Sequence, residues 1–292
     1  METNSTSPKV WFITGSGSGL GRKIAEAALY SGNKVAATAL NPDDLSALRD
    51  KYGNNVEVIK LNVNDEKEAR SAVQTALKAF GRIDVLINNA GYGDIRPFEQ
   101  ITSEEFRALV ETCFFGAVTL TREILPSMRN QRSGHIIQIS SLGGRTAFAG
   151  NSPYYAAKWA LGGFTESLAL EIAPFGIHIT CLEPGAMRTS WGKLANTKNK
   201  QIMPEYESSV GSAIKALENI WGNESGDPEK VASVIVKLVE NDHLPPHILL
   251  GSDSFNAAMK AESNRQKEAE LWKSVSISID FDNHEPIPNL PV

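Results

Sequence analysis

The sequence contains few cysteines and no long apolar stretch. Only Cys113 and Cys181 occur among its 292 residues, so no disulfide framework is expected and a reducing compartment is favoured. No apolar run approaches the length of about 20 residues that a membrane-spanning helix needs. The first residues, METNSTSPK, lack the basic and apolar regions of a secretory signal. The sequence therefore predicts a cytoplasmic protein without a membrane partner.

Basic residues are not in excess either. Lys and Arg total 29 against 34 Asp and Glu, a net charge of −5, so nothing neutralises the phosphates of a nucleic-acid partner. The five histidines are scattered along the chain. His243 and His247 stand four apart, but Pro245 and Pro246 between them prevent the helix that would make them joint ligands. No metal site is predicted.

Short apolar, β-branched runs alternate with helical patterns along most of the chain. Expected strands are residues 9–14, 34–40, 56–61, 84–87, 135–139, 177–182 and 247–250, and expected helices include residues 22–29, 65–80, 102–128 and 153–173. Thr102 and Glu105 form a capping box, and Asp227 followed by Pro228 starts a further helix. The alternation predicts an α/β fold whose parallel sheet is covered on both faces. In such doubly wound sheets, ligands bind beyond the carboxyl ends of the strands.

The first expected strand ends at Thr14 in a glycine-rich turn, GSGSGLG, that opens a helix. This arrangement presents backbone N–H groups and a helix N-terminus to a pyrophosphate. Gly15, Gly19 and Gly21 give the spacing G-x-x-x-G-x-G, whereas the long-chain dehydrogenase pattern would need a glycine at Leu20. A flexible glycine–serine turn that binds nothing is the alternative.

The end of the second expected strand is where such folds bind the adenosine ribose. An acidic residue there favours NAD, because it pairs with free ribose hydroxyls, and a basic residue favours NADP. The chain has Thr38, Ala39, Leu40 and Asn41 at this place. No carboxylate there repels a 2′-phosphate, so the sequence favours NADP(H), with NAD(H) as the alternative.

A serine, a tyrosine and a lysine follow the fifth expected strand. Tyr154 and Lys158 stand four apart on one face of an expected helix, and Ser141 comes thirteen residues before the tyrosine. An ammonium beside a phenol lowers the phenol pKa from its usual ~10 toward the working range. Such a phenol is a general acid for a carbonyl or a general base for an alcohol. A surface helix with an ordinary lysine is the alternative, and the hydroxyl of Ser141 can hold the same substrate oxygen.

These motifs together resemble the short-chain dehydrogenase/reductase family. The resemblance rests on TGSGSGLG (14–21), NNAG (88–91), Ser141, YYAAK (154–158) and PGAMRT (184–189), and it covers residues 8–255. It implies a single-domain Rossmann fold over residues 1–292 with a seven-stranded parallel sheet. Residues 8–185 would form the cofactor-binding and catalytic core. It also implies hydride transfer between a nicotinamide and an alcohol or carbonyl carbon.

The resemblance also implies which residues act. Tyr154 would donate or accept the proton, Ser141 would orient the substrate oxygen, and Lys158 would bind the nicotinamide ribose. Thr189 would hold the carboxamide, and the family's habit of pairing through two long helices implies a homodimer or homotetramer. The implied cofactor-binding residues are Gly15, Ser16, Gly17, Ser18, Gly19, Leu20, Gly21, Thr38, Asn62, Val63, Asn89, Ala90, Gly91, Tyr154, Lys158, Pro184, Gly185, Met187 and Thr189.

The chain departs from the family at two positions. The family usually has an asparagine in the long helix before the serine strand, where it bends the helix and carries a water in the proton relay. Cys113 stands there, and a thiol is a poor donor and acceptor. The relay is then rerouted or weakened, while Cys113 itself is interpreted as a small buried apolar residue. Asn62 replaces an aspartate that often contacts adenine, and its amide oxygen can still accept that bond.

Residues 186–226 would form a lid over the substrate. Apolar residues recur there at helical spacing from Tyr206 onward, and Trp191 precedes them. One interpretation is that this stripe packs on the core; the other is an apolar cover over a bulky, lipid-like substrate. The tail, residues 255–292, includes a charged helix that would lie over the substrate mouth or at a subunit interface.

The sequence thus predicts an NAD(P)(H)-dependent oxidoreductase that acts on a small hydrophobic alcohol or ketone through Ser141, Tyr154 and Lys158. Cys113 keeps a second hypothesis open, namely a protein of this fold with impaired redox activity or a non-redox role in a biosynthetic pathway. A purely structural role is a third, weaker alternative.

Overall fold

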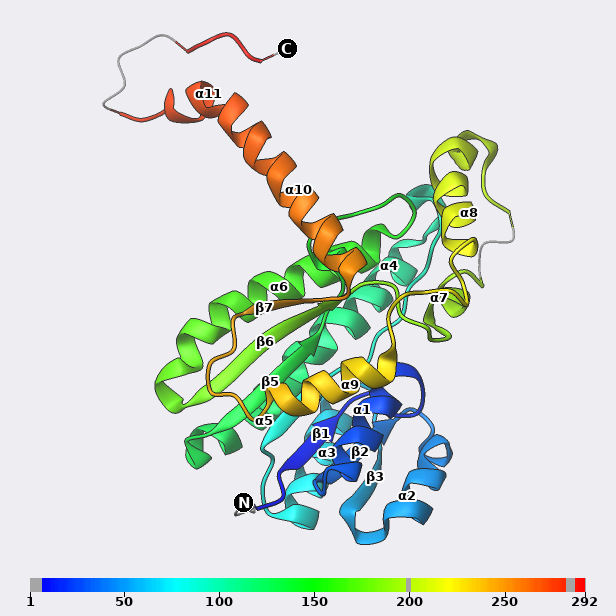
Figure 1. Ribbon diagram of the computed structural model, residues 1–292, viewed down its shortest axis with the longest axis vertical. Helices are drawn as coiled ribbons and strands as arrows, with labels where there is room; N and C mark the ends of the chain where they lie inside the picture. The colour runs from blue at the N-terminus through cyan, green and yellow to red at the C-terminus, as the bar shows by residue number, and fades with distance from the viewer. Residues whose placement is uncertain (1–6, 198–200, 282–286, 292) are drawn as a thin grey trace.

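The computed structural model describes residues 7–197, 201–281 and 287–291. Parts of the expected lid and C-terminal extension, and His284, lie outside the described residues. Seven strands form one parallel sheet, which confirms the predicted fold class (Figure 1). The strands are β1 Val10–Ile13, β2 Lys34–Ala39, β3 Val56–Lys60, β4 Val85–Asn88, β5 Gly134–Ile139, β6 Ile177–Pro184 and β7 His247–Leu250.

The strand order places a crevice beside the glycine turn. The order is β3-β2-β1-β4-β5-β6-β7, so the chain builds outward from β1 in one direction and then returns to build in the other. β1 and β4 pair in parallel, with Trp11 opposite Val85 and Ile13 opposite Ile87. Connections that leave two neighbouring strands on opposite sides open a crevice at their carboxyl ends, where ligands of doubly wound folds bind.

Helices cover both faces of the sheet. They are α1 Gly19–Tyr30, α2 Ser46–Tyr52, α3 Glu66–Phe80, α4 Ser103–Val110, α5 Gly116–Gln131, α6 Ser152–Ile172, α7 Trp191–Ala195, α8 Ser212–Glu218, α9 Pro228–Leu238, α10 Ser252–Leu271 and α11 Lys273–Ile277. Within the described ranges, none of them has the length and apolarity to cross a lipid bilayer. Figure 1 shows α10 leaving the sheet at the end of β7 and extending away from it.

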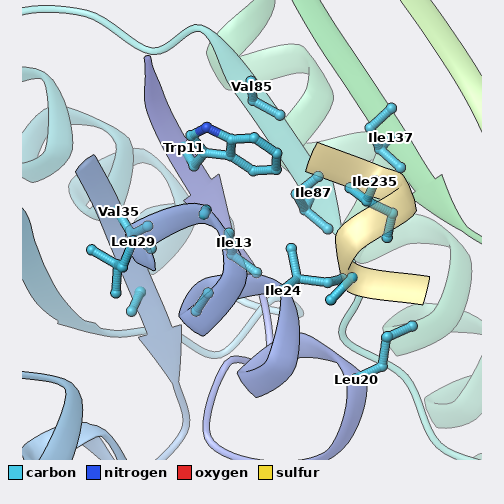
Figure 2. Packing of buried hydrophobic residues seen from close by; sticks show 14 of the residues in the cluster. Trp11, Ile13, Leu20, Ile24, Leu29, Val35, Val85, Ile87, Ile137 and Ile235 are labelled. Atoms are coloured by element: carbon cyan, nitrogen blue, oxygen red, sulfur yellow. The ribbon is translucent and has the colours of Figure 1, made fainter. Parts of the chain in front are cut away.

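Two apolar layers hold the sheet between its helices. On one face, Ile24 of α1 and Ile235 of α9 pack with Trp11, Ile13 and Val35 of the strands, as Figure 2 shows. On the other face, α3, α5 and α6 pack against residues such as Phe12 and Ile136. Full burial of such a side chain contributes about 1.5–3 kcal/mol, so these two layers supply the main driving force for the fold.

Side-chain caps start three helices, and two of these caps were predicted from the sequence. Asp65 accepts hydrogen bonds from Lys67 N at 2.8 Å and Glu68 N at 3.0 Å and caps α3. Thr102 and Glu105 form the expected capping box of α4. Asp227 caps α9. Each cap supplies an acceptor to helix N–H groups that have no partner within the helix.

The prediction of one continuous α-helix over residues 102–128 is wrong in the middle of that range. It is divided into α4, a π-helical turn at Glu111–Phe115, and α5. A π turn adds a residue to the helical repeat, and such bulges occur often at functional sites. Cys113 lies within this turn. The π turn therefore lies at the position where the resemblance expects an asparagine, with cysteine in its place.

Two further segments differ from the sequence-based expectation. Residues 42–55 form α2 between two 3-10 turns, and they bury Leu45 and Leu48 against the sheet. Strand β6 continues to Pro184, two residues beyond the expected end, because Glu183 and Pro184 pair with β7. The extension carries a charged side chain into the edge where ligands are expected.

A buried histidine makes the stability of this fold sensitive to acid. Burial lowers the pKa of His135 from 6.5 to about 4, an effect to which the nearby Lys9 and His178 add. The hydrogen bond with Asn241 O, at 3.2 Å, and the nearby Asp242 act in the opposite direction. The folded state therefore binds this proton less readily than the unfolded state does. Stability from this group is present above pH 6.5 and is lost as the pH falls toward 4.

Replacing His135 by Gln should reduce this acid sensitivity. By proton linkage, His135 accounts for about 2 kcal/mol of the difference between the unfolding free energies at pH 7 and pH 5. Urea unfolding of His135→Gln at both pH values should show a difference smaller by about that amount. His243→Gln, which changes an exposed histidine, is the matched control and should behave like the wild type. An unchanged difference in His135→Gln would show that other groups cause the acid sensitivity.

Candidate active site

The glycine turn between β1 and α1 depends on glycine at three positions. Gly15 and Gly19 have φ angles of +68° and +55°, a backbone region that favours glycine. A Cβ on Gly21 would lie 2.3 Å from Gly15 O and 2.4 Å from Asn89 Nδ2. The helix thus begins in direct contact with the turn that precedes it, as a backbone that cradles a phosphate requires.

Hydrogen bonds fasten this turn to the end of β4. Thr14 Oγ1 accepts from Asn89 N at 2.9 Å and from Ala90 N at 3.0 Å. Asn89 Nδ2 donates to Thr14 O at 2.9 Å and to Gly15 O at 3.2 Å. The NNAG segment therefore holds the glycine turn in place, a role for Asn89 that the sequence did not indicate.

The N-terminus of α1 is suited to an anion. Among the described residues, no side chain caps the helix at Ser18, and its first turn contains no acidic residue. The starts of α3, α4 and α9 are capped by side chains instead. Free N–H groups at a helix start, with the positive end of the helix dipole, attract phosphate groups. The residues present thus fit the pyrophosphate of a dinucleotide.

Two predicted cofactor residues use their hydroxyl groups inside the fold. Thr38 Oγ1 donates to Ile13 O at 3.1 Å, and Ser16 Oγ donates to the same oxygen at 2.9 Å. Ser16 N also donates to Thr38 O at 2.8 Å. Both residues therefore shape the turn, and their direct contact with a cofactor stays a prediction.

A carboxylate that no sequence pattern indicated lies beside this turn. A Cβ on Gly17 would lie 3.4 Å from Asp44 Oδ2, and Arg22 donates to the backbone oxygen of Asp44 at 2.9 Å. Asp44 follows the end of β2 by five residues, too far along the chain for the usual strand-end comparison. Both a negative and a positive group therefore stand near the expected ribose site.

Ser141, Tyr154 and Lys158 meet at the carboxyl edge of the sheet. The Ser141 hydroxyl lies near enough to Tyr154 to lower the pKa of its phenol. Lys158 Nζ lies 5.5 Å from the centroid of the Tyr154 ring and donates to Ile139 O at 2.7 Å. Both Tyr154 and Lys158 are buried. The structure thus brings together the three residues predicted to be catalytic.

The expected effect of Lys158 on Tyr154 needs correction. Burial raises the pKa of the Tyr154 phenol above its ordinary value, and the Ser141 hydrogen bond offsets this only in part. Burial also lowers the pKa of Lys158. Desolvation disfavours the charged form of each group, and it is the largest influence on the pKa of both. In the free protein the phenol therefore keeps its proton at neutral pH, the form that can donate to a carbonyl oxygen.

Cys113 lies against the lysine side of this site. Its thiol donates to Tyr92 O at 3.3 Å, and burial raises its pKa. A Cβ on Gly91 would lie 3.3 Å from the Cys113 sulfur and 3.9 Å from Lys158 Nζ. The thiol is therefore protonated and close to Lys158, as expected of a small buried side chain rather than a nucleophile.

A pocket of about 190 Å³ lies between the NNAG segment and α7. It is lined by Gly91, Tyr92, Gly93, Asp94, Trp191, Leu194, Ala195 and Thr197. The ring centroids of Trp191 and Tyr154 are 5.1 Å apart, so α7 places an indole against the phenol. A Cβ on Gly93 would lie 2.6 Å from the Trp191 ring, and glycine there permits this approach. The predicted lid therefore does adjoin the candidate catalytic residues.

Most of the apolar stripe of the lid packs internally. Val210 and Ile214 are buried with Ile95 and Ala195, and Tyr206 and Leu217 pack against them. The first interpretation of this stripe is thus correct in part, because these residues form a small core of their own. Trp191 joins that core and also faces Tyr154.

The other predicted cofactor residues lie at the same edge. Gly185 N donates to Leu250 O at 3.0 Å, and Met187 pairs with Gly226 beyond the end of β6. Thr189 Oγ1 accepts from Trp191 N at 3.3 Å.

Asn62 and Val63 follow β3. Asn62 is exposed and its side-chain oxygen accepts from Asn64 N at 3.1 Å, whereas Val63 is buried against Gly116. Contacts of both residues with a cofactor stay predictions.

Two of the histidines that look scattered in the sequence are neighbours in the sheet. His135 and His178 are paired across β5 and β6 near the amino ends of these strands, and Asp242 offers a carboxylate within 4.8 Å of both rings. His135 already bonds Asn241 O, and the cation of Lys9 acts on its ring. These features suit a hydrogen-bonded cluster, and the absence of a metal site stays a prediction.

Comparison with known proteins agrees with this geometry. The short chain dehydrogenase family matches residues 9–200. The chain belongs to the short-chain dehydrogenase family. Oxidoreductase BOA17 of Botryotinia fuckeliana is 42% identical over 271 residues, which cover 92% of this chain and 98% of that protein. The solved structure of a short-chain dehydrogenase from Streptomyces avermitilis superposes with a TM-score of 0.86 at 37% identity, and it covers 94% of this chain and 100% of that chain.

A relative whose name includes its substrate is also similar to this chain. The 3-ketodihydrosphingosine reductase of Bacteroides thetaiotaomicron is 33% identical over 240 residues, which cover 82% of this chain and 86% of that protein. The family resemblance drawn from the sequence is thus confirmed, and so is the Rossmann-type parallel sheet. Membership makes the protein an oxidoreductase of a family that depends on a pyridine nucleotide.

Proposed function

We propose that this protein is an NADP(H)-preferring oxidoreductase that transfers hydride between a nicotinamide and a hydrophobic alcohol or ketone. One observation carries the proposal. A buried, protonated Tyr154 lies beside Ser141 and Lys158, at the edge where α1 offers an N-terminus without a side-chain cap. The bound nicotinamide would supply or accept the hydride. Tyr154 would give its proton to the carbonyl oxygen in reduction, or take it back in oxidation.

The neighbouring residues would hold the two ligands. The glycine turn would bind the pyrophosphate, and residues 89–91 would line the cofactor channel. Lys158 would bind the nicotinamide ribose and Thr189 the carboxamide, as the family pattern implies. Ser141 would donate to the substrate oxygen, and a positive Lys158 would stabilise charge that develops on the phenol as its proton leaves.

The preference for NADP(H) rests on the end of β2. Residues 38–41 supply no carboxylate to repel a 2′-phosphate. Asp44 lies beside the turn but is exposed, and Arg22 is held close to it by its bond to the backbone. A cation at this place favours a 2′-phosphate, while the carboxylate opposes it. Direct comparison of the two cofactors decides between NADP(H) and NAD(H).

The substrate class follows from the pocket. Trp191, Leu194 and Ala195 supply an apolar wall of the pocket, and the Trp191 ring lies against Tyr154. A relative of this chain is named as a 3-ketodihydrosphingosine reductase, so its named substrate carries a keto group. Both points support a hydrophobic ketone or alcohol over a phosphorylated sugar.

Absorbance of NADPH at 340 nm tests this function. Purified protein should oxidise NADPH in the presence of long-chain or cyclic apolar ketones. Turnover should be at least about tenfold slower with small polar ketones such as dihydroxyacetone, because they bury less apolar surface. Failure of every ketone in reduction, and of the matching alcohols with NADP⁺ in oxidation, would contradict the proposal.

Cys113 supports one alternative, a member of this family with weakened redox activity. Its thiol is bonded to Tyr92 O and lies where the family's relay asparagine is expected. Under this alternative, Cys113→Asn should raise kcat at least about tenfold, within the range of general acid–base effects. Cys181→Ser, the matched control at the other buried cysteine, should leave it unchanged. A high wild-type kcat that Cys113→Asn does not raise eliminates this alternative.

We also propose a cytoplasmic, single-domain homodimer or homotetramer. The family commonly assembles through its two long helices, which would be α5 and α6 here. Sedimentation equilibrium should give a mass of two or four times 31.7 kDa, and a monomer at micromolar concentration would contradict this assembly.

A further inference from the structure

A fully buried carboxylate stands at the end of β6, close to the catalytic edge. Glu183 is 0% exposed and directly precedes the turn at Pro184 and Gly185. One carboxylate oxygen bonds His247 Nδ1 at 2.7 Å. A buried carboxylate is strongly disfavoured unless partners compensate its charge. The groups around Glu183 must therefore supply that compensation.

A histidine and an arginine face this carboxylate. The bond to Glu183 raises the pKa of His247, whose Nε2 also meets Glu166 at 2.8 Å. On the other side, Arg145 Nε lies 3.8 Å from the second Glu183 oxygen. Among the described residues, neither of these last two atoms has a hydrogen-bond partner, and both are buried. The gap is too short for a bridging water, so a shift of less than about 1 Å would close the bond.

Arg145 belongs to the same compact turn as Ser141. Ser141 Oγ accepts from Gly143 N at 3.0 Å, and Ser141 O accepts from Gly144 N at 2.8 Å. Arg145 N then donates to Leu142 O at 2.9 Å. These three hydrogen bonds link the backbone of Arg145 to the hydroxyl of Ser141. A displacement of Arg145 would therefore also displace that hydroxyl. We call residues 141–145 the serine turn.

The C-terminal helix α10 fastens the other side of the serine turn. Arg145 forms an ion pair with Glu262, and Arg265 donates to Arg145 O at 3.0 Å. The Arg265 guanidinium also lies 5.4 Å from the centroid of the Trp159 ring in α6.

The start of α10 holds the edge around Glu183 itself. Ser254 Oγ donates to Glu183 O at 2.7 Å, and Asp253 Oδ2 accepts from Ala186 N at 2.8 Å. Figure 1 shows this helix leaving the carboxyl edge of the sheet. One helix thus contacts both loops that flank the candidate catalytic residues.

We propose that Glu183 is a positioning residue that holds Arg145, and through it the serine turn, while α10 locks the outer side of Arg145. The inference rests on the proposed function, because it assigns the network to the placement of Ser141. It gives the C-terminal extension a definite task, namely to brace the catalytic edge of its own chain. The charge of Glu183 matters in this account, and its shape alone does not suffice.

Three variants test this account by kinetics. Glu183→Gln keeps the shape and removes the charge, Arg145→Gln removes the partner, and the double variant removes both. Each single variant should lower kcat about tenfold and leave the NADPH dissociation constant within about threefold. The double variant should be no slower than either single variant, because both changes break one interaction. Glu123→Gln, which breaks the distant ion pair with Arg70, is the matched control and should keep the wild-type kcat.

Hydrogen exchange measured by mass spectrometry separates this inference from the proposed function. Exchange of residues 141–150 in the cofactor-free protein should be at least about fivefold faster in Glu183→Gln and Arg145→Gln, even if no redox substrate is found. If Glu183→Gln does not fold, Arg145→Gln, whose side chain is 25% exposed, carries the test. Wild-type exchange rates in Arg145→Gln would overturn the proposal. So would a double variant whose loss of kcat equals the product of the two single-variant losses.

Discussion

Replacing Tyr154 by Phe should remove turnover and leave the cofactor site intact. The change deletes the hydroxyl next to Ser141 and fills the same buried space. A positioned general acid contributes roughly 10²–10⁴-fold to rate, so kcat should fall by about that factor. The NADPH dissociation constant should stay within about threefold, because the ring still packs against Trp191 and the glycine turn is untouched. Stopped-flow or steady-state absorbance at 340 nm measures the first quantity, and nicotinamide fluorescence measures the second.

Tyr155→Phe is a closely matched control. Tyr155 is the next residue of α6, its ring centroid is 6.0 Å from that of Tyr154, and burial raises its pKa as well. Its hydroxyl lies near the backbone of Phe148, which lowers its pKa, and Ser141 is not among the groups that act on it. The control should retain most of the wild-type kcat. Turnover retained by Tyr154→Phe would remove Tyr154 from the proton-transfer step.

Gly21→Ala should abolish tight cofactor binding. The new Cβ would lie 2.3 Å from a backbone oxygen of the same turn, and a backbone oxygen cannot move away as a flexible side chain can. Overpacking of this kind destabilises a protein by about 1–3 kcal/mol. The displaced turn would no longer aim its N–H groups at the pyrophosphate, so the NADPH dissociation constant should rise at least about tenfold. Fluorescence titration measures the affinity, and urea unfolding measures the stability.

Gly163→Ala controls for the change from glycine to alanine within a helix. Gly163 lies in α6, and a Cβ there would meet no atom within 4 Å. Alanine in a helix is favoured over glycine by up to about 1 kcal/mol, so this variant should be as stable as the wild type or more so. Wild-type affinity in Gly21→Ala would show that the turn tolerates a side chain and that its close approach is unnecessary.

The fold could be predicted from the sequence because its signals are local. Each strand is a short β-branched run, and residues such as Asp65, Thr102 and Asp227 mark helix starts within a few positions. The π turn around Cys113 could not be predicted, because continuous helical periodicity does not reveal one extra residue in a turn. The helix over 46–52 was not predicted, because its own N-cap is Leu45 and the capping Asn41 lies before the 3-10 turn that precedes it.

The site residues could be predicted where they belong to one contiguous motif. They could not be predicted where residues from distant elements meet. Tyr154 and Lys158 are on one helix, so their spacing alone placed them on one face. The pKa of Tyr154 could not be read from that spacing, because burial is a property of the whole fold. Glu183 and His247 come from two strands and meet only through the register of β6 and β7. No local pattern distinguishes them from ordinary surface charges.

Titration of the pure wild-type protein with NADPH and with NADH, followed by nicotinamide fluorescence, tests the central claim most directly. It needs no substrate and depends on the glycine turn, Asn89 and Lys158 together. The account predicts saturable binding of one nucleotide per chain, with NADPH bound more tightly than NADH. Tighter binding of NADH would reverse the cofactor preference and leave the site intact. Binding of neither nucleotide would contradict the account, because the uncapped start of α1 would then lack the role from which the redox function follows.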